Sequence, residues 1–436
     1  MFKKLKRAAL GASVPHEKAT AAMQTVKMPV PGKVVLPMQQ HIGEPCTPVV
    51  KKGDTVLVGT LVGKANGAVS ANIYSGVSGT VSAIETVRAS SGAMVPAVVI
   101  TPDGNQTVDS AVKAPVVTDK ASFLAAVQDC GLVGLGGAGF PTAVKLNVPS
   151  GVDTVVINAA ECEPYLAADT REMLENGDSI LAGIRAVMKY LAIKNCVVGI
   201  ENNKPECIET MTRLLKAEAG VTVKTLPSRY PQGAEKVLIE KTTGREVPQG
   251  GLPSDVGVVV LNVTTVSVIG KFLATGMPLT TKRVTVAGDA VQNPQNVEVI
   301  IGTPANEVLA FCGLKQDVPV AKLISGGPMM GVALPDFEHP VVKQTNGLLA
   351  LSAKAAAKPD MGPCIRCGRC IDACPLGLAP VQIAGAFNKK DVEALNKLCV
   401  DLCMMCGTCS YVCPAKRPVT QVMSLAKNFA KKEAQK

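Results

Sequence analysis

The stretch Cys364–Pro375, CIRCGRCIDACP, has the spacing C-x₂-C-x₂-C-x₃-C-P, and the same spacing returns 39 positions later in Cys403–Pro414, CMMCGTCSYVCP. In chains with two [4Fe–4S] clusters, the first three cysteines of one run and the fourth cysteine of the other hold the same cluster. The pattern therefore predicts two crossed ligand sets: Cys364, Cys367, Cys370 with Cys413, and Cys403, Cys406, Cys409 with Cys374.

A pair of zinc sites is the alternative interpretation of these cysteines. Zinc favours two C-x₂-C pairs separated by a longer loop, and a fourth cysteine followed by proline adds nothing to such a site. The segment Val381–Leu402 has apolar residues at helical spacing, which predicts a helical two-cluster domain rather than a β-hairpin ferredoxin. Cations within and after the motifs, such as Arg366, Arg369 and Lys416, partly offset the charge of the clusters, or are solvated surface charge.

Composition excludes several other classes of protein. The chain has 436 residues, 47% of them apolar, with 3% aromatic residues and no Trp, which argues against a binder of single-stranded nucleic acid. Its net charge of +10 favours an acidic partner or a membrane surface. The basic start Met1–Arg7 is followed by a segment too short and too glycine-rich for an export signal. We therefore expect a cytoplasmic protein whose 15 cysteines stay reduced.

No stretch reaches the ~18 apolar residues that a membrane span needs. The longest apolar run, Val256–Gly270, is interrupted by Asn262 and several hydroxyl residues. We therefore expect membrane attachment only through a partner.

The chain divides into an N-terminal tail (1–30) and four domains. Residues 31–112 resemble a lipoyl-type barrel-sandwich, although no lysine between Lys64 and Lys113 could carry an acyl group. An α/β domain (113–253) with a largely parallel sheet, a β-grasp module (254–351) and the cysteine domain (352–436) follow. The expected elements are helices at 123–130, 170–192 and 204–219, strands at 154–157 and 196–200, and the β-grasp runs 283–291 and 302–312.

Glycines cluster in Gly131–Lys145, GLVGLGGAGFPTAVK. Gly134, Gly136 and Gly139 satisfy G-x-G-x-x-G, but the preceding segment reads as helix, whereas the dinucleotide fingerprint follows a strand. Five glycines in nine residues leave backbone N–H groups open to a phosphate or a flat ring.

This loop resembles the flavin loop of the NADH-binding subunit of respiratory complex I. Asn158–Pro164, NAAECEP, resembles that subunit's Asn-Ala-Asp-Glu-x-Glu-Pro stretch, and Tyr230–Glu235 and Asn262–Thr265 resemble its two later cofactor segments. With the barrel-sandwich and the duplicated cysteine motif, residues 15–425 are similar to the C subunit of the Rnf ion-translocating complex.

The resemblance implies a cofactor site. Its residues are Gly134, Gly136, Gly137, Gly139, Phe140, Lys145, Asn158, Glu161, Glu163, Glu235, Asn262 and Thr265. The glycines and asparagines would hold non-covalent FMN, Lys145 would reach its phosphate or the nucleotide, and Phe140 would stack on the nicotinamide nucleotide. The three glutamates would bond the ribose or adenine.

The sequence departs from the family pattern at three places. The family's Asp is Ala160 here, and the last cofactor segment ends in two threonines, which weakens the expected flavin contacts. Cys162 replaces a usually small residue, which predicts a thiol close to the flavin ring.

The resemblance implies electron transfer between NAD(H) as substrate, FMN and two [4Fe–4S] clusters, with no catalytic side chain required. The expected partners are the integral membrane and the flavin and iron–sulfur subunits of an Rnf complex, with ferredoxin reached indirectly. Those subunits would pump Na⁺ or H⁺ while this chain lies peripherally on the cytoplasmic face. Two alternatives stay open: a cobalamin reductase of microcompartments, and a clusters-only adaptor that has lost its flavin.

Overall fold

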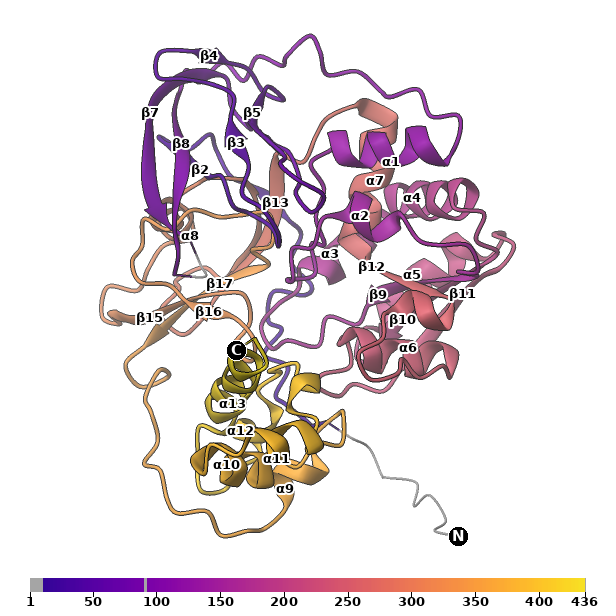
Figure 1. The fold of residues 1–436 in the computed structure, drawn as a ribbon. Coiled ribbons are helices and arrows are strands. Elements are labelled where there is room, and N and C mark those ends of the chain that lie inside the picture. Colours follow the sequence, from indigo (N-terminus) through magenta and orange to yellow (C-terminus); the bar gives the residue numbers. More distant parts are fainter. Residues whose placement is uncertain (1–10, 90–91, 436) are drawn as a thin grey trace.

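The computed structural model describes residues 11–89 and 92–435. Four bodies follow one another along the chain, from an indigo β-domain through a magenta α/β domain and an orange sheet to a yellow helical domain (Figure 1). The basic stretch Met1–Arg7 lies outside the described residues. The architecture is the multidomain α/β arrangement expected from the sequence.

The N-terminal β-domain is a barrel-sandwich made of two antiparallel sheets. The sheets are β2(Val34–Pro37)-β8(Met94–Pro102)-β7(Gly79–Arg88)-β4(Thr55–Val56) and β3(Thr47–Pro48)-β5(Leu61–Lys64)-β6(Ile73–Tyr74). Leu36, Ile73 and Ile100 are fully buried between them. Gly63 lets the layers close, because a Cβ there would lie 2.9 Å from Met38 Sδ.

The α/β domain contains a four-stranded parallel sheet in the order β11(Val221–Leu226)-β10(Asn195–Glu201)-β9(Thr154–Ala159)-β12(Val258–Asn262). The expected boundary at 253/254 placed β12 and the next helix, α7(Val263–Thr275), in the β-grasp module. That placement is wrong, because β12 pairs with β9 in register from Val258–Thr154 to Asn262–Asn158. The domain therefore extends through α7.

Further helices surround this sheet. They are α1(Lys120–Asp129), α2(Thr142–Leu146), α3(Ala168–Glu175), α4(Gly177–Tyr190), α5(Pro205–Leu215) and α6(Glu235–Thr243). The single helix expected over 170–192 is two helices, because Asn176 leaves the helical region at φ −128° and ψ 32° before Gly177. Helices α4 and α7 cross closely, since a Cβ on Gly183 would meet Val266 O at 2.0 Å.

The β-grasp module is built on a mixed six-stranded sheet with helix α8(Ala305–Cys312) packed on it. The sheet order is β1(Val26–Lys27)-β14(Gln295–Ile300)-β13(Thr281–Ala287)-β17(Gly347–Ser352)-β15(Val320–Ser325)-β16(Val332–Ala333). Its edge strand β1 comes from the N-terminal tail and runs parallel to β14. The tail is therefore part of the fold.

Upstream of β1, the tail crosses three bodies. Gly11 N donates to Ala373 O (3.2 Å) in the helical domain, and Lys18 Nζ donates to Glu163 O (3.0 Å) in the α/β domain. Thr20 O accepts from Asn296 in β14 (2.8 Å). These contacts tie the bodies together.

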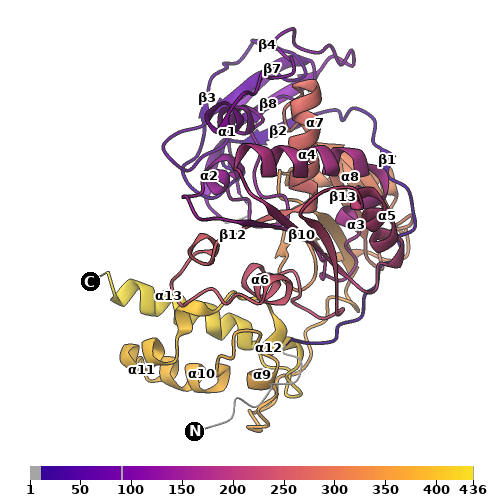
Figure 2. The same ribbon diagram turned by 90° about the vertical axis from the view of Figure 1, so that its right-hand side faces the viewer.

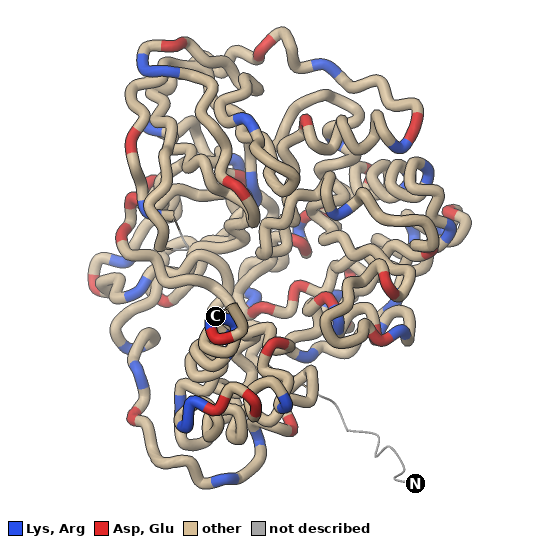
Figure 3. The backbone as a smooth tube through the Cα atoms, viewed as in Figure 1, with Lys and Arg blue, Asp and Glu red and all other residues tan. Residues whose placement is uncertain are grey.

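The regular elements of the C-terminal domain after Ser352 are all helices in its described residues, as expected. Its elements are α9(Arg369–Asp372), α10(Pro380–Asn388), α11(Val392–Lys397), η2(Val400–Leu402), α12(Thr408–Tyr411) and α13(Val419–Glu433). Ile383, Leu395 and Met423 form its core. The domain lies below α6 of the α/β domain (Figure 2). Lys, Arg, Asp and Glu are interspersed over all four bodies (Figure 3).

Candidate functional site

The glycine loop connects α1 to α2 and adopts backbone conformations that need glycine. Gly137 and Gly139 have φ of +125° and +67°, a region that side chains other than glycine rarely enter. A Cβ on Gly136 would lie 3.2 Å from Asn262 Cβ, whereas a Cβ on Gly137 would meet nothing within 4 Å. Gly134 O accepts from Gly139 N (3.2 Å), which closes the loop on itself. The loop is therefore a fixed concave backbone beside Asn262.

Two asparagines stand at the carboxyl ends of neighbouring parallel strands, where α/β sheets bind their ligands. Asn158 lies near the end of β9 and is the register partner of Asn262 in β12. Asn262 Oδ1 caps α7 by accepting from Thr264 N (3.0 Å) and Thr265 N (3.2 Å). Thr265 Oγ1 in turn accepts from Leu135 N of the glycine loop at 2.9 Å. Four of the expected cofactor residues, Gly136, Asn158, Asn262 and Thr265, thus belong to one connected site.

Glu161 and Glu163 were expected to bond a nucleotide, but in the structure both carboxylates have backbone partners. Glu161 is buried and accepts from Asp169 N (2.7 Å) and Thr170 N (3.2 Å) at the start of α3. Glu163 accepts from Met329 N (3.0 Å) and Met330 N (2.8 Å) of the β-grasp module. Both carboxylates thus link separate segments of the protein.

Lys145 and Glu235 remain accessible. Lys145 Nζ lies 2.6 Å from Glu235 Oε1, and their side chains are 30% and 40% exposed. Phe140, at the end of the glycine loop, is half-buried. The side chains of Lys145 and Glu235 are therefore more accessible to an incoming nucleotide than that of Glu161, which is 5% exposed.

Asp169 was not identified from the sequence. Its buried carboxylate accepts from Asn262 Nδ2 (2.7 Å) and Thr264 Oγ1 (2.6 Å). Burial, with Glu161 nearby, raises the pKa of Asp169 to about 6. The Asp169 carboxylate fixes the orientation of the Asn262 amide. In the sequence, the one feature that could have identified Asp169 is its position in the first helical turn after the NAAECEP stretch.

The two cysteine motifs fold alike. In each, the residue before the second cysteine (Arg366, Met405) and the glycine after it (Gly368, Gly407) have φ between +55° and +85°. A short helix, α9 or α12, then carries the third cysteine. The equal spacing thus produces the same backbone twice.

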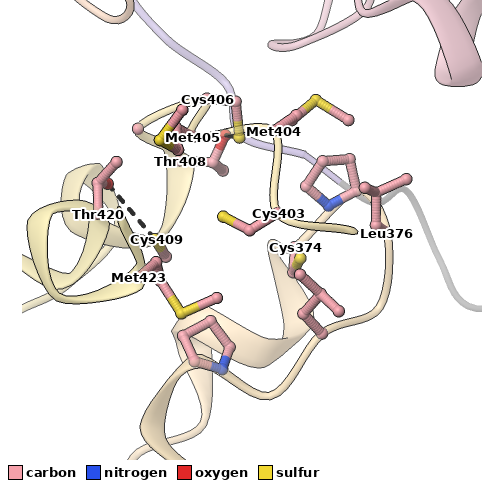
Figure 4. A pocket seen from close by; sticks show the side chains of 14 residues that line it. Cys374, Leu376, Cys403, Met404, Met405, Cys406, Thr408, Cys409, Thr420 and Met423 are labelled. Atoms are coloured by element: carbon pink, nitrogen blue, oxygen red, sulfur yellow. Dashed lines mark hydrogen bonds between the residues drawn. The ribbon is translucent and has the colours of Figure 1, made fainter. Parts of the chain in front are cut away.

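The second ligand set surrounds one pocket. Cys374 from the first motif lines this pocket together with Cys403, Cys406 and Cys409 from the second (Figure 4). Leu376, Met404, Met405 and Met423 complete an apolar shell. This is the crossed arrangement expected for a cubane, and four thiols in a mostly apolar shell fit one.

The other ligand set lies at the surface. Cys364 and Cys367 are exposed, and Cys370 and Cys413 are half-buried. The neighbouring side chains Met361 and Ile365 are 59% and 65% exposed. Over residues 11–89 and 92–435, no three His, Cys, Asp or Glu side chains are grouped as for a single metal ion.

Burial makes the pocket thiols hard to ionise. It raises the pKa of Cys374 and Cys403, and it raises the pKa of Cys409 to about 11, although a bond to Thr420 opposes the effect at Cys409. Iron ligation requires thiolates, so metal binding here must release protons.

Tyr230 joins the flavin-type site to this pocket. Its buried hydroxyl donates to Cys406 O at 2.7 Å, while Gly233 O, three residues on, accepts from Asn158 Nδ2 at 2.8 Å. Cys162, expected beside the flavin ring, accepts from Gly233 N at 3.4 Å and packs with Tyr230 and Cys406. Burial raises the pKa of its thiol to about 12.

Comparison with known families defines the class of this protein. Residues 127–271 match the Nuo51 FMN-binding domain, and residues 357–414 match the 4Fe-4S dicluster domain. Residues 6–105 match the RnfC barrel sandwich hybrid domain, and residues 283–333 match the SLBB domain. The chain is thus an iron–sulfur flavoprotein by class, with sites for FMN and [4Fe–4S] clusters.

Similar proteins narrow the class to a family. The chain is 45% identical over 360 residues to the C subunit of the Na(+)-translocating ferredoxin:NAD(+) oxidoreductase complex of Acetobacterium woodii, covering 81% of each protein. It is 43% identical over 381 residues to the proton-translocating counterpart of Clostridium ljungdahlii, covering 86% of this chain and 83% of that one. The chain belongs to the family of C subunits of ion-translocating ferredoxin:NAD⁺ oxidoreductase complexes, as the resemblance predicted.

A solved structure shares the fold. An NAD⁺-reducing [NiFe]-hydrogenase in the H₂-reduced state matches with a TM-score of 0.50 and 18% identity, over 71% of this chain and 63% of that one. Among the helices of the described residues, none has the length and apolar character of a membrane span.

Proposed function

We propose that this chain exchanges electrons with NAD(H) on the cytoplasmic face of a membrane-bound, ion-translocating complex and passes them to a partner protein of that complex. Relatives named for Na⁺ and for proton translocation are both similar to it, so the ion depends on other subunits. The chemistry that bound FMN would supply here is the conversion between two-electron hydride transfer and single-electron transfer. The residues of the chain itself position the flavin, the nucleotide and the clusters relative to one another.

The observation that carries the proposal is the continuity between the two sites. Asn158 binds the backbone of the segment Tyr230–Glu235, and Tyr230 of the same segment binds the loop of Cys406. A single short segment thus sets the spacing between the flavin-type loop and the pocket of four cysteines. The pocket set is the flavin-side cluster site, and the exposed set Cys364, Cys367, Cys370 and Cys413 is the exit toward a partner.

We assign binding of the nicotinamide nucleotide to the more accessible residues beside the glycine loop. The Lys145–Glu235 pair is partly exposed, and Phe140 lies half-buried at the end of the glycine loop. Gly137 leaves room for a ring to approach the backbone. Glu161 and Glu163 hold α3 and the Met329–Met330 turn, so they support the site without contacting the nucleotide.

The test is anaerobic reconstitution with iron, sulfide and FMN, followed by titration with NADH. We expect bleaching of the flavin absorbance and then the low-temperature electron-spin signal of reduced clusters. A chain that binds zinc and holds no acid-labile sulfide, or whose absorbance does not respond to NADH, would contradict the proposal.

A further inference from the structure

The glycine loop rests against a third body, the β-grasp module, at several points. Lys343, which lies between β16 and β17, is 1% exposed, and its ammonium donates to Gly131 O at 2.7 Å and to Asn72 O. Lys282 of β13 is 3% exposed, and its Nζ lies 3.5 Å from Leu135 O. Two carbonyl groups of the loop thus receive bonds from buried lysines of a neighbouring module.

Burying a lysine is unfavourable, and the structure shows it. Burial lowers the pKa of both Lys282 and Lys343 to about 8. Asp169 and Glu172 partly compensate Lys282, whereas Lys343 has mainly the carbonyl groups and two buried thiols nearby. A buried lysine is unfavourable unless its ammonium is hydrogen-bonded. Here both ammonium groups bond to carbonyl groups of the glycine loop, and they therefore fix its backbone.

Gln344, the next residue, lies against the other end of this loop. A Cβ on Gly139 would be 3.4 Å from Gln344 Cδ and 3.7 Å from its Oε1. This Oε1 atom is buried and has no hydrogen-bond partner among the described residues. A buried acceptor without a partner is unusual in a folded protein and is commonly completed by a ligand or an ordered water.

Two further buried polar atoms belong to segments near this site. Thr142 Oγ1, at the start of α2, and Gln232 Nε2, in the segment Tyr230–Glu235, also lack partners among the described residues. Thr142 follows Phe140 by two positions, and Gln232 lies beside Gly233, which binds Asn158. Gln344 and Thr142 thus contact the glycine loop itself, and Gln232 belongs to the segment that Asn158 and Lys145 bind.

We propose that Gln344 is an FMN-binding residue, so that the β-grasp module supplies a third wall of the flavin site. Its carboxamide oxygen accepts a hydrogen bond from a donor group of the bound flavin, and Lys343 fixes the segment that presents it. This proposal rests on the proposed function, since it assigns a residue to the same FMN site.

The test uses the full chain with the variant Gln344→Ala and the matched control Gln106→Ala. Gln106 also has a buried Oε1 without a partner among the described residues, but it lies in the barrel-sandwich, where its Nε2 donates to Gly76 O. FMN affinity is measured by quenching of flavin fluorescence, and the stability of the FMN-free chain by thermal unfolding. We expect Gln344→Ala to weaken FMN binding about five- to tenfold, as for one lost hydrogen bond to a buried group.

Because Oε1 has no partner in the free protein, the melting temperature of FMN-free Gln344→Ala should match that of the wild-type chain, and Gln106→Ala should bind FMN normally. FMN affinity of Gln344→Ala within twofold of wild type would overturn the proposal, as would a loss confined to NADH binding. A wild-type chain that binds no FMN would instead overturn the proposed function, so the two failures are distinguishable.

Discussion

The two cysteine motifs have the same spacing and the same backbone conformation but opposite surroundings. The thiols of Cys403, Cys406 and Cys409 line an apolar pocket whose loop binds Tyr230 of the α/β domain. Cys364 and Cys367 face solvent beside Met361 and Ile365. The motif spacing thus determines the ligand geometry of each cluster site. The packing around each copy determines whether that site faces the α/β domain or solvent.

The pocket shows the crossing of the ligand sets directly. Cys374 belongs to the exposed motif in sequence but lines the buried pocket in space. Each cubane would therefore take one thiolate from the other motif, and neither site is complete without both motifs. The duplication couples two sites that otherwise differ in solvent access.

The largest expected effect comes from removing one thiol from each set. Cys406→Ser should lose about half of the iron and leave a flavin that NADH bleaches but no cluster that NADH reduces quickly. Cys367→Ser should lose the same amount of iron yet keep one cluster that NADH reduces at the wild-type rate. Iron and acid-labile sulfide analysis, with rapid-freeze electron-spin spectra, would separate the two.

If Cys367→Ser abolished cluster reduction while Cys406→Ser preserved it, the assignment of the flavin-side cluster would be reversed. Loss of nearly all iron, or of cluster reduction, in both variants would mean that the two ligand sets do not form independently.

The next effect concerns Tyr230. Tyr230→Phe removes the donor to Cys406 O and leaves that buried carbonyl unpaired, which should lower the free energy of unfolding by about 1–3 kcal/mol and slow flavin-to-cluster transfer severalfold. Tyr190→Phe is the matched control, because Tyr190 donates to Val117 O at 3.0 Å far along the chain from the cysteines. Both variants should lose stability in denaturant titrations, but only Tyr230→Phe should slow cluster reduction in stopped-flow traces. Equal rates in the two variants would remove Tyr230 from the connection.

The two ligand sets should differ in how the rate of cluster assembly depends on pH. Burial raises the pKa of three pocket thiols, Cys374, Cys403 and Cys409, and that of one thiol in the exposed set, Cys370. The thiolate fraction grows with pH by up to about tenfold per pH unit for each thiol that must ionise. Cluster assembly in Cys367→Ser, which retains only the pocket set, should therefore accelerate between pH 7 and 9 more steeply than in Cys406→Ser. The rate of appearance of cluster absorbance measures this. Parallel pH profiles would show that burial of the pocket thiols does not limit assembly.

The cysteine motif shows what the sequence can predict. Its ligand spacing is local, and a repeated local pattern forms the same backbone wherever it occurs, as Arg366 and Met405 show. The helical nature of the domain followed from the apolar spacing of Val381–Leu402, which forms α10, α11 and η2. The barrel-sandwich, the flavin-type domain and the β-grasp module were identified by resemblance.

What the sequence could not predict depends on contacts between distant segments. Glu163 looks like a free acidic residue until the turn at Met329 is brought against it by another module. Strand β12 reads equally well as the first strand of the next domain, and only its pairing with β9 assigns it. Nothing in the neighbourhood of Gln344 marks it in sequence, because its partner surface, Gly139, belongs to a distant part of the chain.

The smallest expected effect tests the charges around the exposed cluster site. Arg366 lies between Cys364 and Cys367, and reduction adds one negative charge to a cluster held there. Arg366→Gln should make this reduction less favourable and lower the midpoint potential of the exposed cluster by a few tens of millivolts at most, because an exposed charge contributes no more than about 1 kcal/mol. The shift should shrink as salt concentration rises. Lys397→Gln, on the exposed face of α11, provides the control. A redox titration of Cys406→Ser, in which only the exposed set remains, resolves the shift. An equal shift for both substitutions would mean that only net charge, and not the position of Arg366 within the motif, affects the cluster.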